Sequence, residues 1–297
     1  MTEPNRHFSH SQLSSAFGDA GCLRLWAYRY VEKMTSPTNG ALHVGSSWDY
    51  LTRVVIGEKI NGNIVNEERA ENIITHTFNN PLEETNAGVP IEYDFSDIDQ
   101  DQTLDRLVSA AKLYITDVLP TIDPVSVQRE VRTTVLPGVD ILGYVDLVER
   151  AGDGSLVVTD NKASLSGKAS RTPAKAMTDQ QLALYQAMIA KEDGNTPMSR
   201  GWRILDIGYK KTIAKFSTIL VREQSVATAN KLNDLTMQSV TQQAGALLAI
   251  EKTGLFPPTG RGTWKCSEKW CGYFDICEYG RKSRTSIAVG VEDEEWR

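Results

Sequence analysis

The sequence lacks the segments that carry a protein into or across a membrane. It has no run of about 18 apolar residues, the length that a membrane-spanning helix requires. Its first residues, MTEPNRHFSHSQLSSAF, contain no basic region followed by an apolar one, so we expect no signal peptide. We therefore expect a cytoplasmic protein with no membrane partner.

Positive charge is also scarce. The chain has 32 Lys and Arg residues against 38 Asp and Glu residues, for a net charge of −6. This balance argues against a protein that coats nucleic acid through its bulk charge. A local basic groove is compatible with it, because residues 161–178 contain no acidic side chain but four basic ones: Lys162, Lys168, Arg171 and Lys175. The alternative interpretation of this run is a solvated loop.

The spacing of apolar residues predicts helices first and strands later. Helical periods cover residues 9–34 (with a break near 18–21), 42–56, 65–80 and 101–119. Runs rich in Val, Ile and Thr then predict strands at 125–135, 141–151 and 156–164, a helix at 178–192, strands at 201–211 and 215–223, and a helix at 224–252. This order predicts an α/β (or α+β) fold, with a sheet core flanked by helices.

The chain shows no internal repeat and no low-complexity linker. We expect residues 1–285 to form a single domain. Within it, 1–124 would be the mainly helical N-terminal part, 125–222 the sheet core, and 223–285 a helix followed by a cysteine cluster. Residues 286–297 would be an acidic tail.

Two aspartates are expected to face each other in the hairpin around GDGS, residues 152–155. If the turn is centred near Asp153, Asp146 and Asp160 both lie seven residues from the centre and pair across the strands. Directly opposed residues have Cβ atoms about 4.5–5.5 Å apart, where like charges are destabilising unless compensated. A divalent cation such as Mg²⁺, which takes carboxylate oxygens, would compensate them. A register shift of one residue would turn one carboxylate to the other face.

Lys162 lies two positions after Asp160 and therefore shares its face of the strand. An ammonium there could bind a phosphate or help polarise a metal-bound water. The alternative is a surface ion pair between the two residues.

Gln181 and Tyr185 share a face of the next predicted helix, since they are four residues apart. Both could contact a phosphate or a base. The alternatives are a capping box formed by Thr178 and Gln181, and a core position for Tyr185 with its hydroxyl at the edge.

Three of the four cysteines fall close together, in WKCSEKWCGYFDIC, and the fourth lies far before them. Disulfides are rare in a reducing cytoplasm, so clustered cysteines suggest a metal site. The alternative is four isolated thiols in the core.

In order and spacing, GYVDLVE, LVVTDNKAS and QLALY resemble the RecB-type branch of the PD-(D/E)XK nuclease superfamily. The resemblance covers about residues 120–222 and implies a restriction-endonuclease-like mixed sheet flanked by helices. It implies five catalytic residues: Asp146, Asp160, Lys162, Gln181 and Tyr185. Asp146 and Asp160 would be metal ligands, and Glu130, on the preceding strand, resembles a carboxylate often found upstream of them.

The sequence departs from this branch on an early helix. Members carry Gly-x-x-x-His, whose His contacts the metal. In the matching segment, LHVGSSWDYL, counting from Gly45 places Asp49 there, while His43 does not align. Aspartate is a competent ligand for Mg²⁺ or Mn²⁺. The alternative for Asp49 is a solvated helix residue.

The cysteines resemble those of RecB-like nucleases that hold an iron–sulfur cluster, such as the AddB nuclease domain and CRISPR-associated RecB-like exonucleases. These carry one cysteine before the core and three after it, as do Cys22, Cys266, Cys271 and Cys277. The resemblance implies a [4Fe–4S] cluster that ties the first helix to the C-terminal segment. The common spacing is C-x2-C-x5-C, whereas this chain has C-x4-C-x5-C, so a structural Zn²⁺ is the alternative.

The resemblance implies a Mg²⁺- or Mn²⁺-dependent DNA exonuclease, a hydrolase of phosphodiester bonds. It would serve DNA recombination, repair or replication in a bacterium or a phage-infected cell, because the sequence is also similar to phage nucleases. We expect a DNA partner with a free end, single-stranded at the site, and a recombination protein is a candidate partner. DNA would contact Trp48, Lys168, Arg171 and Lys175 by stacking and charge. The alternative is a DNA-end-binding component of a recombination or CRISPR-adaptation complex, with weak or lost cleavage.

Overall fold

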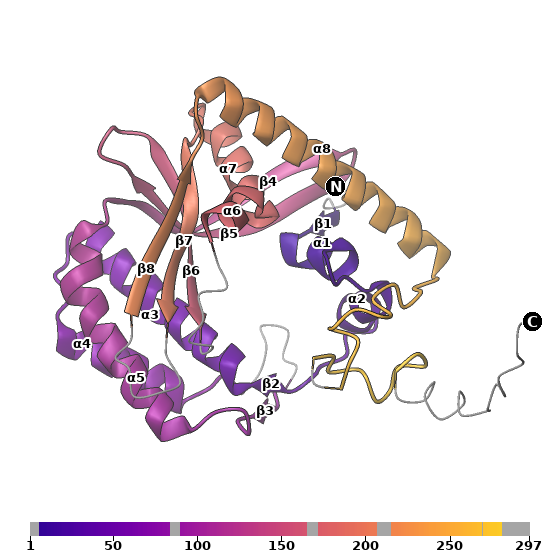
Figure 1. Cartoon of the computed structure of the whole chain (residues 1–297), viewed down its shortest axis with the longest axis horizontal. Coiled ribbons are helices and arrows are strands. Elements are labelled where there is room, and N and C mark those ends of the chain that lie inside the picture. The colour runs from indigo at the N-terminus through magenta and orange to yellow at the C-terminus, as the bar shows by residue number, and fades with distance from the viewer. Residues whose placement is uncertain (1–5, 84–89, 165–171, 207–214, 269, 281–297) are drawn as a thin grey trace, which may run out of the picture. The chain divides into compact units, whose positions relative to one another are not determined.

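The computed structural model describes residues 6–83, 90–164, 172–206, 215–268 and 270–280. The chain divides into two compact units, the first formed by residues 1–7 and 38–241 and the second by residues 8–37 and 242–297. Each unit is described by itself below, with its elements labelled as in Figure 1. The single domain expected for residues 1–285 stays a prediction, and the expected acidic tail lies outside the described residues.

A six-stranded mixed sheet forms the centre of the first unit, which confirms the predicted fold class. Its strands are β1 (Arg6–Phe8), β4 (Pro124–Leu136), β5 (Val139–Arg150), β6 (Leu156–Ser164), β7 (Ser199–Asp206) and β8 (Lys215–Arg222). The order is β1-β5-β6-β7-β8, and β4 also pairs with β5. Only the β6–β7 pair is parallel among the four pairs from β4 to β8. The five longer strands match the predicted ones, while the short β1 was not predicted.

The hairpin of β5 and β6 has the register expected from the sequence. The pairs Leu147–Thr159 and Arg150–Leu156 place its centre at residue 153. The turn is stabilised locally, because Asp153 Oδ1 accepts hydrogen bonds from Ser155 N at 3.0 Å and from Ser155 Oγ at 2.7 Å. Continuing the register by one residue places Asp146 opposite Asp160.

Three helices pack against one another and against the sheet: α3 (Gly40–Ile60), α4 (Glu67–Asn79) and α5 (Gln100–Leu113). Asn39, Asn66 and Asp99 cap their N-termini through side-chain oxygens. Their apolar faces form a buried cluster that includes Leu147 and Leu205 of the sheet. Figure 1 shows α4 and α5 beside α3. The short strands β2 (Thr38–Asn39) and β3 (Tyr93–Asp94) pair in parallel nearby.

The predicted helix over 101–119 ends early. After α5 the chain forms a π-helical turn (Tyr114–Val118) and a 3-10 turn (Leu119–Thr121) with Pro120 inside it. Because proline has no N–H and restricts the residue before it, a regular α-helix cannot continue through this position.

Between the parallel strands β6 and β7 the chain crosses over through α6 (Pro173–Thr178) and α7 (Gln180–Asp193). The α7 helix is capped by Asp179, whose side chain accepts from Leu182 N at 2.9 Å. The capping box expected from Thr178 is therefore wrong. The long helix α8 (Val226–Thr253) follows the sheet, and no helix in the described ranges is long and apolar enough to cross a membrane.

The second unit joins segments that are far apart in the sequence. It contains α1 (His10–Phe17) and α2 (Leu23–Tyr30), separated at the predicted break, together with the described residues after α8. Leu23 N donates to Thr259 Oγ1 at 3.0 Å, and Tyr273 Oη donates to Met34 O at 2.8 Å. These bonds connect the α2 region to the C-terminal segment within one compact unit.

Candidate active site

Three aspartates converge in the first unit from three different elements. Asp49 comes from α3, Asp146 from β5 and Asp160 from β6. Asp160 is only 3% exposed, whereas the other two are half-buried. Asp146 Oδ2 accepts a hydrogen bond from the backbone N–H of Asn161 at 2.9 Å, which fixes its carboxylate against β6. The solvated position considered for Asp49 is wrong, because its side chain is half-buried and accepts from Gln128.

The Lys162 ammonium contacts both oxygens of the Asp160 carboxylate, with Nζ 2.8 Å from Oδ1 and 2.7 Å from Oδ2. This is not the exposed surface pair considered as the alternative, because the Asp160 side chain is 4% exposed and that of Lys162 is 32% exposed. The Lys162 ammonium is thus held against a buried carboxylate, while the lysine side chain remains partly exposed to solvent.

Burial makes the ionised forms of these carboxylates costly. It raises the pKa of Asp160 to about 7, and the charge of Asp146 adds to the rise while Lys162 opposes it. Burial also raises the pKa of Asp146, again against the effect of Lys162. Likewise, burial raises the pKa of Asp49, opposed first by Arg53 and then by Lys162. Crowded, buried carboxylates of this kind favour the binding of a cation.

The donors at this site fit a hard divalent cation in their chemistry. Asp160 Oδ2 is buried and forms an ion pair with Lys162, and the Asp160 carboxyl also interacts with that of Asp146. No group of three or more His, Cys, Asp or Glu side chains in the described ranges is arranged to hold a metal ion. The carboxylates are instead engaged by Lys162, Asn161 and Gln128, and they would have to turn from these partners to share an ion.

Gln181 and Tyr185 project from the first two turns of α7. Gln181 Nε2 lies 3.4 Å from Tyr185 Oη. The Tyr185 ring is buried, and Asp146 and Asp160 both act on its hydroxyl, whose pKa is raised chiefly by burial. The ring of Tyr185 therefore takes the core position considered as the alternative, and its contact with a phosphate or a base stays a prediction.

Two expected site residues are not part of this arrangement. Glu130 is exposed on β4, opposite Tyr144, whose hydroxyl donates to it at 3.0 Å. It therefore does not join the aspartates. Trp48 is 2% exposed and packs edge-on against Tyr114, with ring centroids 5.6 Å apart. The expectation that Trp48 stacks on DNA is wrong, because its ring belongs to the core.

The expected basic DNA contacts are described only in part. Lys168 and Arg171 lie outside the described residues, and Lys175 is exposed on α6. His43, which does not align with the family histidine, is a core residue here. Its Nε2 contacts the carbonyl oxygen of Phe78 at 2.9 Å, and its ring packs against those of Phe78, Tyr93 and Phe95.

Sequence reasoning missed Gln128. This residue lies on β4 between the pairs Val127–Leu147 and Arg129–Val145, and hence opposite Asp146. Its Nε2 donates to Asp49 Oδ1 at 2.9 Å and lies 3.5 Å from Asp146 Oδ1. Counting back across the PGVD turn does not find it, because the register of β4 and β5 shifts between Thr134 and Leu136.

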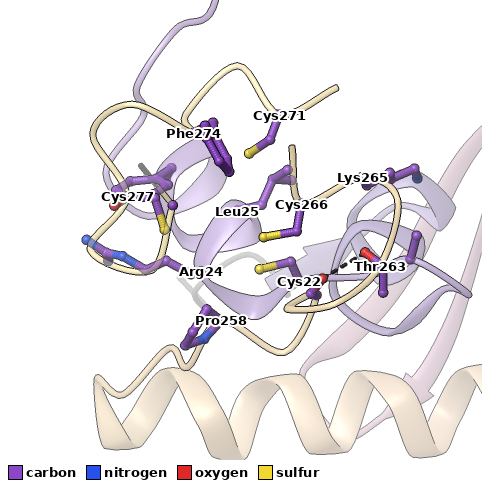
Figure 2. A pocket seen from close by; sticks show the side chains of 14 residues that line it. Cys22, Arg24, Leu25, Pro258, Thr263, Lys265, Cys266, Cys271, Phe274 and Cys277 are labelled. Atoms are coloured by element: carbon purple, nitrogen blue, oxygen red, sulfur yellow. Dashed lines mark hydrogen bonds between the residues drawn. The ribbon is translucent and has the colours of Figure 1, made fainter. Parts of the chain in front are cut away.

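The four cysteines line one pocket of the second unit. Figure 2 shows the side chains of Cys22, Cys266, Cys271 and Cys277 among those that line it. Burial raises the pKa of the Cys271 thiol, and the other three cysteines add to the rise. All four are free cysteines, and each is partly exposed. The close approach of Gly260 to Cys22, where an added Cβ would lie 2.8 Å from the cysteine Cβ, makes a side chain there unfavourable.

Comparison with known proteins gives one decisive match. The model of the PD-(D/E)XK nuclease superfamily matches residues 7–278. We find no match among curated proteins. The crystal structure of SSO0001 is 14% identical and aligns over 93% of this chain and 88% of its own, with a TM-score of 0.35, a similarity too low to carry an argument. From the extent of the family match, the chain belongs to the PD-(D/E)XK nuclease superfamily.

Proposed function

We propose that the protein is a Mg²⁺- or Mn²⁺-dependent deoxyribonuclease that hydrolyses DNA from a free end. Membership of the superfamily implies metal-dependent nuclease activity. The observation that carries the proposal is the buried Asp160 carboxylate opposite Asp146, with Lys162 Nζ 2.8 Å from Asp160 Oδ1. Two carboxylates and an ammonium meet at the end of two paired strands, as metal-assisted hydrolysis requires.

In this proposal Asp146 and Asp160 hold the metal ion, with Asp49 as a third oxygen donor from α3. When bound, the ion would lower the pKa of a water and neutralise charge on the phosphate. Lys162, partly exposed beside Asp160, orients that water or stabilises the charge that develops on the phosphate. Gln181 and Tyr185 present a polar edge of α7 to the same site and bind the phosphate or the adjacent sugar.

The narrower assignment rests on the resemblance of the motifs to the RecB-type branch. It supports exonuclease action on a single-stranded end and a role in recombination, repair or replication of phage or bacterial DNA. Lys175, the last basic residue of the run over 161–178, is exposed on α6, and we propose that it contacts the DNA backbone outside the aspartate site.

We also propose that Cys22, Cys266, Cys271 and Cys277 hold a [4Fe–4S] cluster, with a structural Zn²⁺ as the alternative. Their shared pocket supports a common ligand, because four thiolates suit either group. As with the aspartates, the thiols are not arranged as a metal-ligand group in the described residues. The bound group would fasten the start of α2 to the C-terminal segment.

A cleavage assay tests the proposed function. Full-length protein, purified without oxygen, is incubated with linear and circular DNA, single- and double-stranded, in Mg²⁺, Mn²⁺ or EDTA. We expect loss of linear DNA only, and only with a divalent metal. Asp160→Asn should reduce cleavage to background, whereas Asp153→Asn, at the exposed turn of the same hairpin, should retain it. Full activity of Asp160→Asn would contradict the assignment.

The second candidate function is DNA-end binding with weak or lost cleavage, within a recombination or CRISPR-adaptation complex. It is favoured by Asp49, which stands where the resembling nucleases carry a histidine. Tight binding of linear DNA by a protein that cleaves it in neither metal would support this function over the first.

A further inference from the structure

Gln128 connects two carboxylates that belong to different parts of the fold. Its Nε2 donates to Asp49 Oδ1 at 2.9 Å and lies 3.5 Å from Asp146 Oδ1. Asp49 is on α3 and Asp146 on β5, whereas Gln128 is on β4. One neutral amide thus stands between two like charges. A hydrogen-bond donor there stabilises both carboxylates in their ionised forms without adding a charge of its own.

The backbone of Gln128 is unusual for a strand. Its φ angle is +47°, in the left-handed region that residues with a Cβ rarely adopt. The neighbours on either side reach different partners: Val127 packs into the cluster of α3, α4 and α5, while Arg129 pairs with Asp193 at the end of α7. On a regular strand these two side chains would share a face. The positive φ of Gln128 therefore lies between two residues with different surroundings, and its side-chain amide contacts Asp49.

Backbone geometry alone does not account for glutamine at this position. Glycine adopts positive φ at no steric cost, and asparagine adopts it more readily than most residues. Strained backbone of this kind occurs at functional sites, where the surrounding structure holds it. The long amide side chain, with its reach to Asp49, is the feature that glycine would remove.

We infer that Gln128 is a positioning residue of the metal site, which holds the Asp49 carboxylate beside Asp146 so that it serves as the third oxygen donor. This inference rests on the proposed function. According to this inference, the residue of β4 that serves the metal site is Gln128, which lies opposite Asp146, and not Glu130. Without Gln128, Asp49 keeps its place on α3 but its side chain is not held toward the strands.

The test measures Mn²⁺ binding to the protein by calorimetry, without DNA. Only the binding that is lost in Asp160→Asn is counted as binding at the proposed site. Loss of a residue that orients a metal ligand typically weakens affinity about 10–100-fold, and we expect this for Gln128→Gly. Its melting temperature should equal or exceed that of the wild type, since glycine relieves the backbone at positive φ. A structural role alone would not produce weaker binding with undiminished stability.

Lys33→Gly is the matched control, because Lys33 is the other non-glycine residue with positive φ in the described ranges, at +52°. It should leave Mn²⁺ affinity unchanged. The double variant Asp49→Ala with Gln128→Gly should bind Mn²⁺ no more weakly than Asp49→Ala alone, because Gln128 acts through Asp49.

Two results would overturn the inference and leave the proposed function standing. In the first, Gln128→Gly binds Mn²⁺ as tightly as the wild type. In the second, the losses of Mn²⁺ affinity in Asp49→Ala and Gln128→Gly add fully in the double variant. A different result would contradict the proposed function as well. If Asp160→Asn binds Mn²⁺ as tightly as the wild type, the proposed metal site is wrong and the inference about Gln128 falls with it. In cleavage assays, Gln128→Gly should need about 10–100-fold more Mg²⁺ for half-maximal rate, with the rate at saturation largely recovered.

Discussion

Gly143 lies directly against the ring of Tyr185, and a Cβ added at Gly143 would come within 2.5 Å of Tyr185 Cε1. The first residue of GYVD and the last of QLALY are therefore in contact. The glycine leaves room for the ring, and the ring brings its hydroxyl toward the aspartate three residues after the glycine. The two motifs constrain each other through packing as well as through chemistry.

Gly143→Ala should destabilise the first unit by about 1–3 kcal/mol, the usual cost of overpacking, because the Tyr185 ring must move. It should also reduce cleavage. Gly152→Ala is the control, since nothing lies within 4 Å of a Cβ added there. Urea unfolding measures the difference between the two variants. Equal stability of both would show that the ring is not held by the glycine.

Lys162→Met should separate catalysis from metal binding. Removing the ammonium eliminates a positive charge beside Asp160, so Mn²⁺ affinity should be kept or increased. Cleavage should fall about 100–1,000-fold, the typical loss when one group that stabilises charge on the reacting phosphate is removed. Lys175→Met, on the exposed surface of α6, should lower the rate far less. Loss of Mn²⁺ binding in Lys162→Met would mean that the lysine organises the site instead.

The cysteine pocket should contain iron and sulfide in protein purified without oxygen, which would then be brown. Colourless protein with about one zinc per chain would identify the alternative group. In either case Cys22→Ser should lower the melting temperature by several degrees, because Cys22 precedes α2 while the other three belong to the C-terminal segment. An unchanged melting temperature, with the metal content intact, would remove Cys22 from the ligand set.

The buried ion pair between Arg203 on β7 and Glu149 on β5 allows a test of what stabilises the sheet. Arg203 Nη2 lies 3.2 Å from Glu149 Oε1, and both side chains are less than one-tenth exposed. Arg203→Met should cost about 3–5 kcal/mol because it leaves a buried charge unpaired. The double variant Glu149→Leu with Arg203→Met should recover most of that loss.

Arg222→Met provides the matched control for this pair. It breaks the exposed pair of Arg222 with Asp153 on the same sheet and should change stability little. Urea unfolding of the variants checks these outcomes together. A double variant as unstable as Arg203→Met alone would show that packing, and not the unpaired charge, causes the loss.

Much of the site could be predicted because the register of a short hairpin follows from counting. The turn at Asp153 determined the pairing of Asp146 with Asp160, and the alternation of a strand placed Lys162 beside the second aspartate. The burial of Trp48 was also within reach of the sequence. It shares a helical face with Val44, Leu51 and Val55, and all four are buried.

Gln128 could not be predicted in the same way. Its left-handed backbone depends on two different helices that pack on neighbouring residues of one strand, and periodicity does not record such a change. Glu130 was expected at the site from the family resemblance, but it lies opposite Tyr144 and accepts a hydrogen bond from the Tyr144 hydroxyl. The π-helical turn after α5, in which Tyr114 is fully buried, was likewise not visible in the spacing of apolar residues.

The second unit is formed by two segments that are far apart in the sequence, which has a consequence for the order in which the protein folds during synthesis. Residues 8–37 are synthesised before the sheet of the first unit, but their partners after residue 242 are synthesised after it. Until then Leu23 and Trp26, buried in the finished protein, lack the segment that helps to cover them. The second unit can therefore form only after the strands of the first unit have been synthesised, and any group held by all four cysteines is acquired only after Cys277 has emerged.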